Sequence, residues 1–387
     1  MGGKVFEHSK LLTPRMSPEL YRRMIAQCQP TLETIFRNVV VPREAPNKID
    51  HGDIDFLVEG KLHQVPDEDI WKLVEGGLAA EFVEKRGESR SYAVPHPDIL
   101  NAYVQIDIEL SPGNGIIGAA DLFEWMKFMK GDADLLQIIG IAHRPLGLTC
   151  NNRGLHVRVE QIEPYDKKKA LLFLTRDPDQ AMQFYGFDVE KYKEGFKSET
   201  DLFDWVAAGR FFSSETLEHR VEKSADRSRL LKRHMYRHFV EDYMPKTTRI
   251  AGNRWTRQEV LRAATKTFDV QKKYDDMMAT HNAEEAEKEL WLEVKAIIPA
   301  KDKALSSAVK PLKRWVRFSN CRPVIGDRPI PHTEYFRWSE HVVQSNKNDV
   351  LGWVALNWQA VKSHDRAYEK HHGHSPYGPY SSEQSES

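Results

Sequence analysis

The sequence predicts an α+β protein in which a mixed sheet with flanking helices is followed by a mostly helical domain. Three observations support this class. Segments typical of short strands stop near Thr175. Segments with a hydrophobic period of 3.6 residues take over after it. The chain has 387 residues, 40% of them hydrophobic, which is enough for two or three domains with cores of their own. We expect an N-terminal arm, a sheet domain, a helical domain and a disordered tail, with the bounds 1–29, 30–176, 177–370 and 371–387.

Each expected element follows from its residue pattern. Residues 31–41 indicate a helix that runs into an apolar strand. Further strands are expected where apolar, β-branched and aromatic residues gather in short runs, at 53–58, 91–95, 103–110, 155–162 and 169–175. Helices are expected where apolar residues recur with helical spacing, at 199–212, 228–244, 257–298, 304–318 and 349–372. A loop rich in Pro and Gly is expected at 320–331.

The composition excludes several classes of protein. The 56 Lys and Arg residues nearly balance the 57 Asp and Glu residues, so the whole chain is not a polycation that coats nucleic acid. The cysteines Cys28, Cys150 and Cys321 are widely spaced, which argues against disulfide frameworks and zinc ribbons. No apolar run approaches the ~20 residues of a membrane helix, and the start of the chain lacks the apolar core of a secretory signal. We expect a cytoplasmic or nuclear protein that does not bind membranes.

The most informative segment is DHGDIDFLV, residues 50–58. Strand alternation places Asp53 and Asp55 on one face and the apolar residues that separate and follow them on the other. The strand expected at 103–110 repeats the arrangement, with Asp107 and Glu109 opposite its apolar face. If the two strands are neighbours, three carboxylates converge.

Converging carboxylates repel one another unless a cation lies among them. Oxygen ligands suit Mg²⁺ or Mn²⁺, and two such ions about 3.5–4 Å apart lower the barrier to phosphoryl or nucleotidyl transfer. The alternative is that these acidic residues are only the hydrated face of a one-sided sheet.

The segment GDIDFLV, followed about fifty residues later by Asp107 in an apolar strand, resembles the nucleotidyltransferase superfamily of the DNA polymerase beta type. The resemblance covers roughly residues 30–176 and implies a polymerase-beta-type nucleotidyltransferase domain there. It implies that Asp53, Asp55 and Asp107 bind two divalent ions, Mg²⁺ or Mn²⁺, and that Asp107 assists deprotonation of the acceptor hydroxyl. The implied reaction moves a nucleoside monophosphate from an NTP to a hydroxyl of RNA, a protein or a small molecule, and releases pyrophosphate.

One segment departs from the family pattern. Members of the superfamily carry Gly-Ser or Gly-Gly about ten residues before the first Asp, where this chain has Pro42 and Arg43. Pro42 removes a backbone N–H that could contact phosphate. We expect Arg43 and Lys48 to replace those contacts with charge-assisted hydrogen bonds, and Gly52 of the motif to bind the nucleotide with them. The alternative is that nucleotide binding is weakened or lost.

Residues 113–118 fit the G-x-G-x-x-G pattern of dinucleotide-binding loops. The strand before them carries acidic residues on one face, whereas a central parallel strand is apolar on both faces. We therefore interpret this segment as a turn between a strand and a helix that borders the expected active site.

Residues 210–273 contain 16 Lys and Arg but only 8 Asp and Glu. Cations of this segment could meet the phosphates of a nucleic acid, and we single out Lys232, Arg233, Arg237 and Arg254. The alternative is a solvated helix surface whose apolar residues point to the core, namely Leu230, Leu231, Met235 and Phe239. A second hypothesis for the protein follows: a catalytically inactive nucleotidyltransferase fold that acts as a nucleic-acid-binding or protein-interaction scaffold.

Overall fold

The computed structural model describes residues 3–87, 89–113, 120–213, 224–246, 255–331, 334 and 336–372. The chain forms two compact units, Met1–Lys272 and Lys273–Ser387. Three of the sequence predictions lie outside the described residues: the role of Arg254, most of the glycine-rich segment, and the tail from residue 373 onward. Among the described helices, none is both long enough and apolar enough to cross a membrane.

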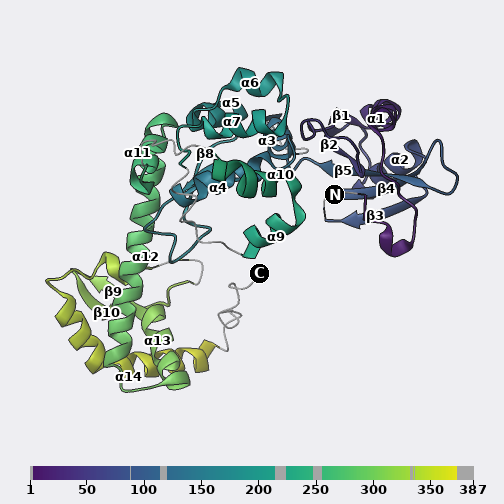
Figure 1. Ribbon diagram of the computed structural model, residues 1–387. Helices are drawn as coiled ribbons and strands as arrows, with labels where there is room; N and C mark the ends of the chain where they lie inside the picture. The colour runs from purple at the N-terminus through teal and green to yellow at the C-terminus, as the bar shows by residue number, and fades with distance from the viewer. Residues whose placement is uncertain are drawn as a thin grey trace. The chain divides into compact units, whose positions relative to one another are not determined.

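The first unit begins with a mixed five-stranded sheet in the order β1-β2-β5-β4-β3 (Figure 1). Strands β2 and β5 run parallel, and the other neighbours are antiparallel. The bounds of the strands and of the two helices packed on them are α1 Pro18–Glu33, β1 Phe36–Val40, β2 Asp53–Lys61, α2 Asp67–Gly77, β3 Phe82–Arg86, β4 Ser89–Pro95 and β5 Tyr103–Leu110.

One face of this sheet forms a hydrophobic core with α1 and α2. Ser17 caps the N-terminus of helix α1, since its side chain accepts a hydrogen bond from the backbone N–H of Leu20, and Pro18 fits the first helical position. The buried residues of α1 recur every three or four positions, which gives the helix one apolar stripe. The stripe packs against sheet residues that are almost fully buried, among them Ile54, Phe56, Val58, Val104, Ile106 and Ile108.

The opposite face of the sheet is polar and is covered at two places. Residues 3–12 cover one end, where Val5 and Phe6 pack against Ala93 of β4. Helix α3, Ala120–Lys130, covers the other end, where Phe123 and Met126 pack against Leu57 of β2. The part of the polar face between these two covers holds the candidate site.

The rest of the first unit is mostly helical, with one three-stranded antiparallel sheet in the order β6-β7-β8. Its helices and strands are α4 Leu135–His143, β6 Leu148–Asn151, β7 Gly154–Arg158, β8 Leu171–Thr175, α5 Pro178–Tyr185, α6 Val189–Glu194, α7 Glu199–Ala207, α9 Ser224–Lys232, α10 His234–Arg237 and α11 Arg257–Thr267. A π-helical turn follows α10 at His238–Tyr243.

Helix α12, Gln271–Ile297, leads into the second unit, whose other elements are α13 Asp302–Trp315, β9 Val316–Ser319, β10 Arg322–Ile325 and α14 Lys347–His372. The core of this unit contains Trp291, Trp315 and Trp338. The sequence patterns predicted a helix through residue 318 and then a loop, and both predictions are wrong in detail. The helix ends at Trp315, and Asn320 and Cys321 adopt positive φ values of 49° and 60°, which form a tight turn between two antiparallel strands.

The fold is therefore α+β, with a mixed sheet near the N-terminus and a mostly helical remainder, as the sequence predicts at this coarse level. The strands expected at 53–58, 91–95, 103–110, 155–162 and 169–175 all correspond to strands of the structure. The cysteines Cys28, Cys150 and Cys321 are free.

Candidate active site

The sheet brings the aspartates of two distant segments together. Strands β2 and β5 are parallel neighbours, and Asp55 lies directly opposite Asp107 in the register. Asp53 lies two residues earlier on the same face of β2, opposite Gln105. The strands are thus neighbours, which is the condition under which the carboxylates converge.

Hydrogen bonds hold two of the three carboxylates in place. The backbone N–H of Gly3 donates to Oδ2 of Asp53 at 3.1 Å. The side-chain amide of Gln105 donates to both oxygens of Asp107 at 3.0 Å, and its own carbonyl oxygen accepts a hydrogen bond from the backbone N–H of Val5 at 3.1 Å. Residues 3–5 therefore orient the acidic side chains from across the polar face.

The protein environment opposes the charged form of all three aspartates. Asp55 reaches solvent at the surface of the cleft, yet protein atoms surround most of its carboxylate. Loss of hydration, together with the charges of Asp53 and Asp107, raises the pKa of Asp55 to about 7. Burial also raises the pKa of Asp53, and it raises the pKa of Asp107 against the opposing effect of a hydrogen bond with Ser91. The carboxylates therefore repel one another, and Asp55 is partly protonated at neutral pH.

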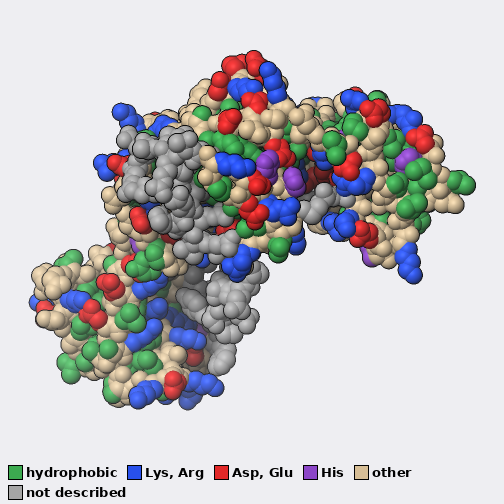
Figure 2. Space-filling model, viewed as in Figure 1, with side chains coloured by type: hydrophobic (Ala, Val, Ile, Leu, Met, Phe, Trp, Pro, Cys, Tyr) green, Lys and Arg blue, Asp and Glu red, His purple; other side chains and the backbone are tan. Residues whose placement is uncertain are grey.

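A small open pocket of ≈ 100 Å³ lies over Asp55 and Asp107. Figure 2 shows acidic and basic side chains around the recess beside the sheet. The pocket is lined by residues of β2 to β5, of α3 and of the segment after β1: Pro42, Asp55, Phe56, Leu57, Arg86, Ser89, Ser91, Asp107, Ile108, Glu109 and Lys130. The ammonium of Lys130 donates to Oε2 of Glu109 at 2.6 Å, so a cation and a carboxylate close the pocket on the α3 side.

The residues predicted to contact nucleotide phosphates already have partners within the protein. Arg43 donates two parallel hydrogen bonds of 2.7 Å to Asp132, a carboxylate whose side chain is only 1% exposed. Its third hydrogen bond goes to the backbone oxygen of Tyr192. Lys48 pairs with Glu44 at 2.7 Å. Gly52 is buried next to Gly3.

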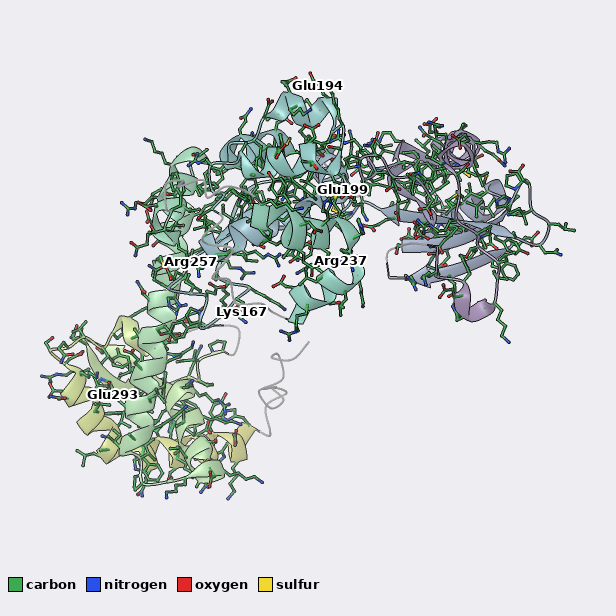
Figure 3. The ribbon with its side chains drawn as sticks, in the orientation of Figure 1. Lys167, Glu194, Glu199, Arg237, Arg257 and Glu293 are labelled. Carbon is green, nitrogen blue, oxygen red and sulfur yellow. The ribbon has the colours of Figure 1, made fainter. Side chains whose placement is uncertain are left out.

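The predicted nucleic-acid contacts lie on α9 and α10. The side chains of Lys232 and Arg237 are exposed, and Figure 3 labels Arg237. Arg233 is different because its guanidinium donates to the buried carboxylate of Asp134 at 2.7 Å. Of the apolar residues expected in the core, Met235 and Phe239 are buried, whereas Leu231 is 81% exposed, so that expectation is wrong for Leu231.

The sequence patterns missed several residues that line or order the site: Gly3, Arg86, Ser91, Gln105 and Lys130. Gln105 and Ser91 follow from alternation once the pairing of β4 with β5 is known, since both share a face with Asp107. Gly3 and Lys130 reach the site through tertiary contacts alone and leave no signal in the local sequence.

Within the described residues, the acidic and other ligand-type side chains do not form a ready-made group of three or more that could hold a metal ion. Asp53 and Asp107 instead accept the hydrogen bonds given above. Comparison with models of known protein families gives no match, and comparison with curated protein sequences gives none either.

Proposed function

We propose that the protein is a metal-dependent nucleotidyltransferase that uses Asp53, Asp55 and Asp107. The observation that carries this proposal is the in-register pairing of β2 with β5, which sets Asp55 opposite Asp107 on a polar face. Three carboxylates with raised pKa values are costly to keep together, and divalent cations would relieve their repulsion. A hydrated sheet face would need no such concentration of acid in a half-covered cleft.

The proposed fold family is the nucleotidyltransferase superfamily of the DNA polymerase beta type. The mixed sheet, the D-x-D pair at the start of one strand and the third Asp on the adjacent parallel strand all agree with this family's pattern. The missing Gly-Ser segment does not agree with this pattern. Arg43 and Lys48 pair with acidic residues of the protein, and in this state they do not supply the phosphate contacts that the Gly-Ser segment makes in the family.

In this proposal the chain's own groups do the following. Asp53, Asp55 and Asp107 would hold Mg²⁺ or Mn²⁺, and the oxygen-only donor set suits such hard cations. A bound divalent ion would supply neutralisation of the negative charge that develops on the phosphates. Asp107 would accept the proton of the acceptor hydroxyl, a role that a raised pKa favours. One P–O bond to the acceptor forms, the P–O bond to the leaving pyrophosphate breaks, and the nucleoside monophosphate stays on the acceptor.

A transfer assay tests the proposal. The protein is incubated with each α-labelled NTP and Mg²⁺ or Mn²⁺ in the presence of an RNA pool or a cell lysate, and both labelled product and pyrophosphate are measured. We expect metal-dependent transfer that Asp55→Asn abolishes. The matched control is Asp50→Asn, a half-exposed residue next to the motif whose carboxylate pairs with Arg15. Transfer that survives Asp55→Asn, or no transfer with any NTP and either metal, would contradict the proposal.

A further inference from the structure

The pocket above the aspartates is lined by basic as well as by acidic side chains. The lining includes three carboxylates and two cations, namely Asp55, Asp107, Glu109, Arg86 and Lys130. Ser89 and Ser91 also line the pocket, but their hydroxyls already donate within the protein, Ser89 to the backbone oxygen of Arg86 and Ser91 to Asp107. Such a mixture suits a ligand that carries negative charge and is bridged to the carboxylates by a cation.

Strand pairing brings Arg86 to the polar face. Arg86 is the last residue of β3 and pairs with Ser89 of β4, and Ser89 pairs with Glu109 of β5. The side chain of Arg86 is exposed, and among the described residues its guanidinium has no ion-pair or hydrogen-bond partner. The positive charge of Arg86 lowers the pKa of Asp107. Burial raises the same pKa by more, so the net shift is upward. Arg86 therefore stands close enough to act on the acidic cluster while its donors remain free for a ligand.

The contrast with Arg43 is informative. The sequence predicts Arg43 as a phosphate ligand, but three of its guanidinium hydrogen bonds go to Asp132 and to the backbone oxygen of Tyr192. Lys130 comes from α3 rather than from the β3–β4 hairpin, and its positive charge lowers the pKa of Asp55 against the larger effect of burial. Arg86 and Lys130 are thus the cations that the pocket itself presents.

We infer that this pocket binds a phosphate group of a substrate through Arg86, with Lys130 as a second cation. The inference deepens the proposed function and rests on it, because the anion would have to share the pocket with Asp55 and Asp107. Without a divalent cation those carboxylates repel phosphate, so binding should require Mg²⁺. The phosphate is either part of the nucleotide's phosphate chain or a phosphate of the acceptor.

The test measures binding of two probes by isothermal titration calorimetry with the full chain. Tripolyphosphate stands for the phosphate chain of a nucleotide, and glycerol phosphate stands for an acceptor phosphate, each with and without Mg²⁺. We expect Mg²⁺-dependent binding of at least one probe, weakened about tenfold by Arg86→Gln, which is the effect of losing one charge-assisted hydrogen bond. The control is Lys85→Gln, the preceding residue of β3, which pairs with Glu68 on the other face of the sheet.

Each outcome has one meaning for the pocket. A loss with tripolyphosphate assigns it to the nucleotide, and a loss with glycerol phosphate alone assigns it to the acceptor. If Arg86→Gln binds both probes as tightly as Lys85→Gln, or if neither probe binds the parent protein, the inference is overturned. Mg²⁺ binding by the parent and by Asp55→Asn is measured in the same experiment. If the parent protein binds Mg²⁺ but Arg86→Gln does not weaken probe binding, the inference is wrong and the proposed function stands. If the parent protein does not bind Mg²⁺, both are wrong.

Discussion

Gly3 lies far from Asp53 in the sequence but contacts it directly in the fold. Its φ is +74°, and a Cβ at this position would lie 2.2 Å from the backbone oxygen of Gly52. Only glycine fits there without a backbone shift. The N–H of Gly3 also donates to Asp53. This glycine therefore holds the start of residues 3–12 against Gly52 and orients one carboxylate of the candidate site.

We expect Gly3→Ala to lower the free energy of unfolding by about 1–3 kcal/mol, because the added methyl group must displace the backbone around Gly52. Urea denaturation measures this loss. Gly76→Ala is the control, since Gly76 lies in α2 with open space around it, and alanine there should be neutral or slightly stabilising. Equal stability of Gly3→Ala and the parent would show that residues 3–12 do not pack on the polar face in this way.

The guanidinium of Arg43 stabilises the fold through its paired hydrogen bonds to Asp132. We expect Arg43→Ala to destabilise the protein by about 3 kcal/mol, because it leaves the buried carboxylate of Asp132 without its partner. Arg43→Lys should recover only part of the loss, since an ammonium cannot make the paired hydrogen bonds. Denaturant unfolding measures both variants, with the exposed Arg22→Ala as the control. If Arg43→Ala unfolds like the parent but loses NTP binding, Arg43 is a phosphate ligand as its sequence position suggests.

At the scale of elements, the two strands that carry the aspartates could be predicted because each has one apolar and one polar face. The alternation in β5 gives both its bounds and its orientation, and the same holds for the start of β2. Strand β3 could not be predicted, because it is a short edge strand rich in charged residues whose Phe82 is 42% exposed. The hairpin β9–β10 was hidden because its first residues continue the apolar spacing of α13.

The candidate site divides in the same way. Asp53, Asp55 and Asp107 follow from local alternation, while their adjacency depends on the parallel pairing of β2 with β5. Arg86 and Lys130 join the pocket through the β3–β4 hairpin and through α3. Local patterns in one sequence carry no information on such contacts. The ion pairs of Arg43 with Asp132 and of Lys48 with Glu44 could not be predicted for a related reason, since these partners come together only in the fold.

Helices α9 and α10 carry the exposed cations Lys232 and Arg237. We expect any binding of single-stranded RNA at this surface to weaken steeply with salt, and Lys232→Ala/Arg237→Ala to reduce the slope of log K against log salt by about 1.4, or 0.7 for each lost phosphate contact. Fluorescence anisotropy over a salt series measures the slope. Arg233 is left in place because its contact with Asp134 is internal. Lys303→Ala/Lys310→Ala, which removes two exposed charges from α13 in the second unit, is the control for charge alone. An unchanged slope would exclude this surface as the contact.

At the scale of the whole molecule, the chain consists of two units, and the second has a core built from its own residues. Trp291, Trp315 and Trp338 pack with Val350 and Val354, all within Lys273–Ser387. We expect a fragment that begins at Gln271, the first residue of α12, to fold alone and to unfold in a single cooperative transition. Tryptophan fluorescence and circular dichroism in urea measure this. A fragment with helical signal but no cooperative transition would contradict a separate core.

Burial of Asp55 and its repulsion by Asp53 and Asp107 also make the stability of the protein depend on pH. The pKa of Asp55 in the fold, about 7, is above its unfolded value of about 3.9. Its contribution to stability is therefore full below pH 3.9 and is lost as the pH rises through 7. Without metal, Asp55→Asn should consequently raise the melting temperature at pH 8 and change it less at pH 5. A lower melting temperature for Asp55→Asn at pH 8 would indicate that the carboxylate is not under repulsion.

The most direct measurement of the central claim is Mg²⁺ or Mn²⁺ binding to the full protein at pH 8 and at pH 6. A cation that enters the cluster must displace the proton that Asp55 holds below its pKa of about 7. The account predicts binding that is about tenfold weaker at pH 6 than at pH 8, and that is lost in Asp55→Asn but kept in Asp50→Asn. Equal affinity at both pH values, or metal binding that survives Asp55→Asn, would contradict it.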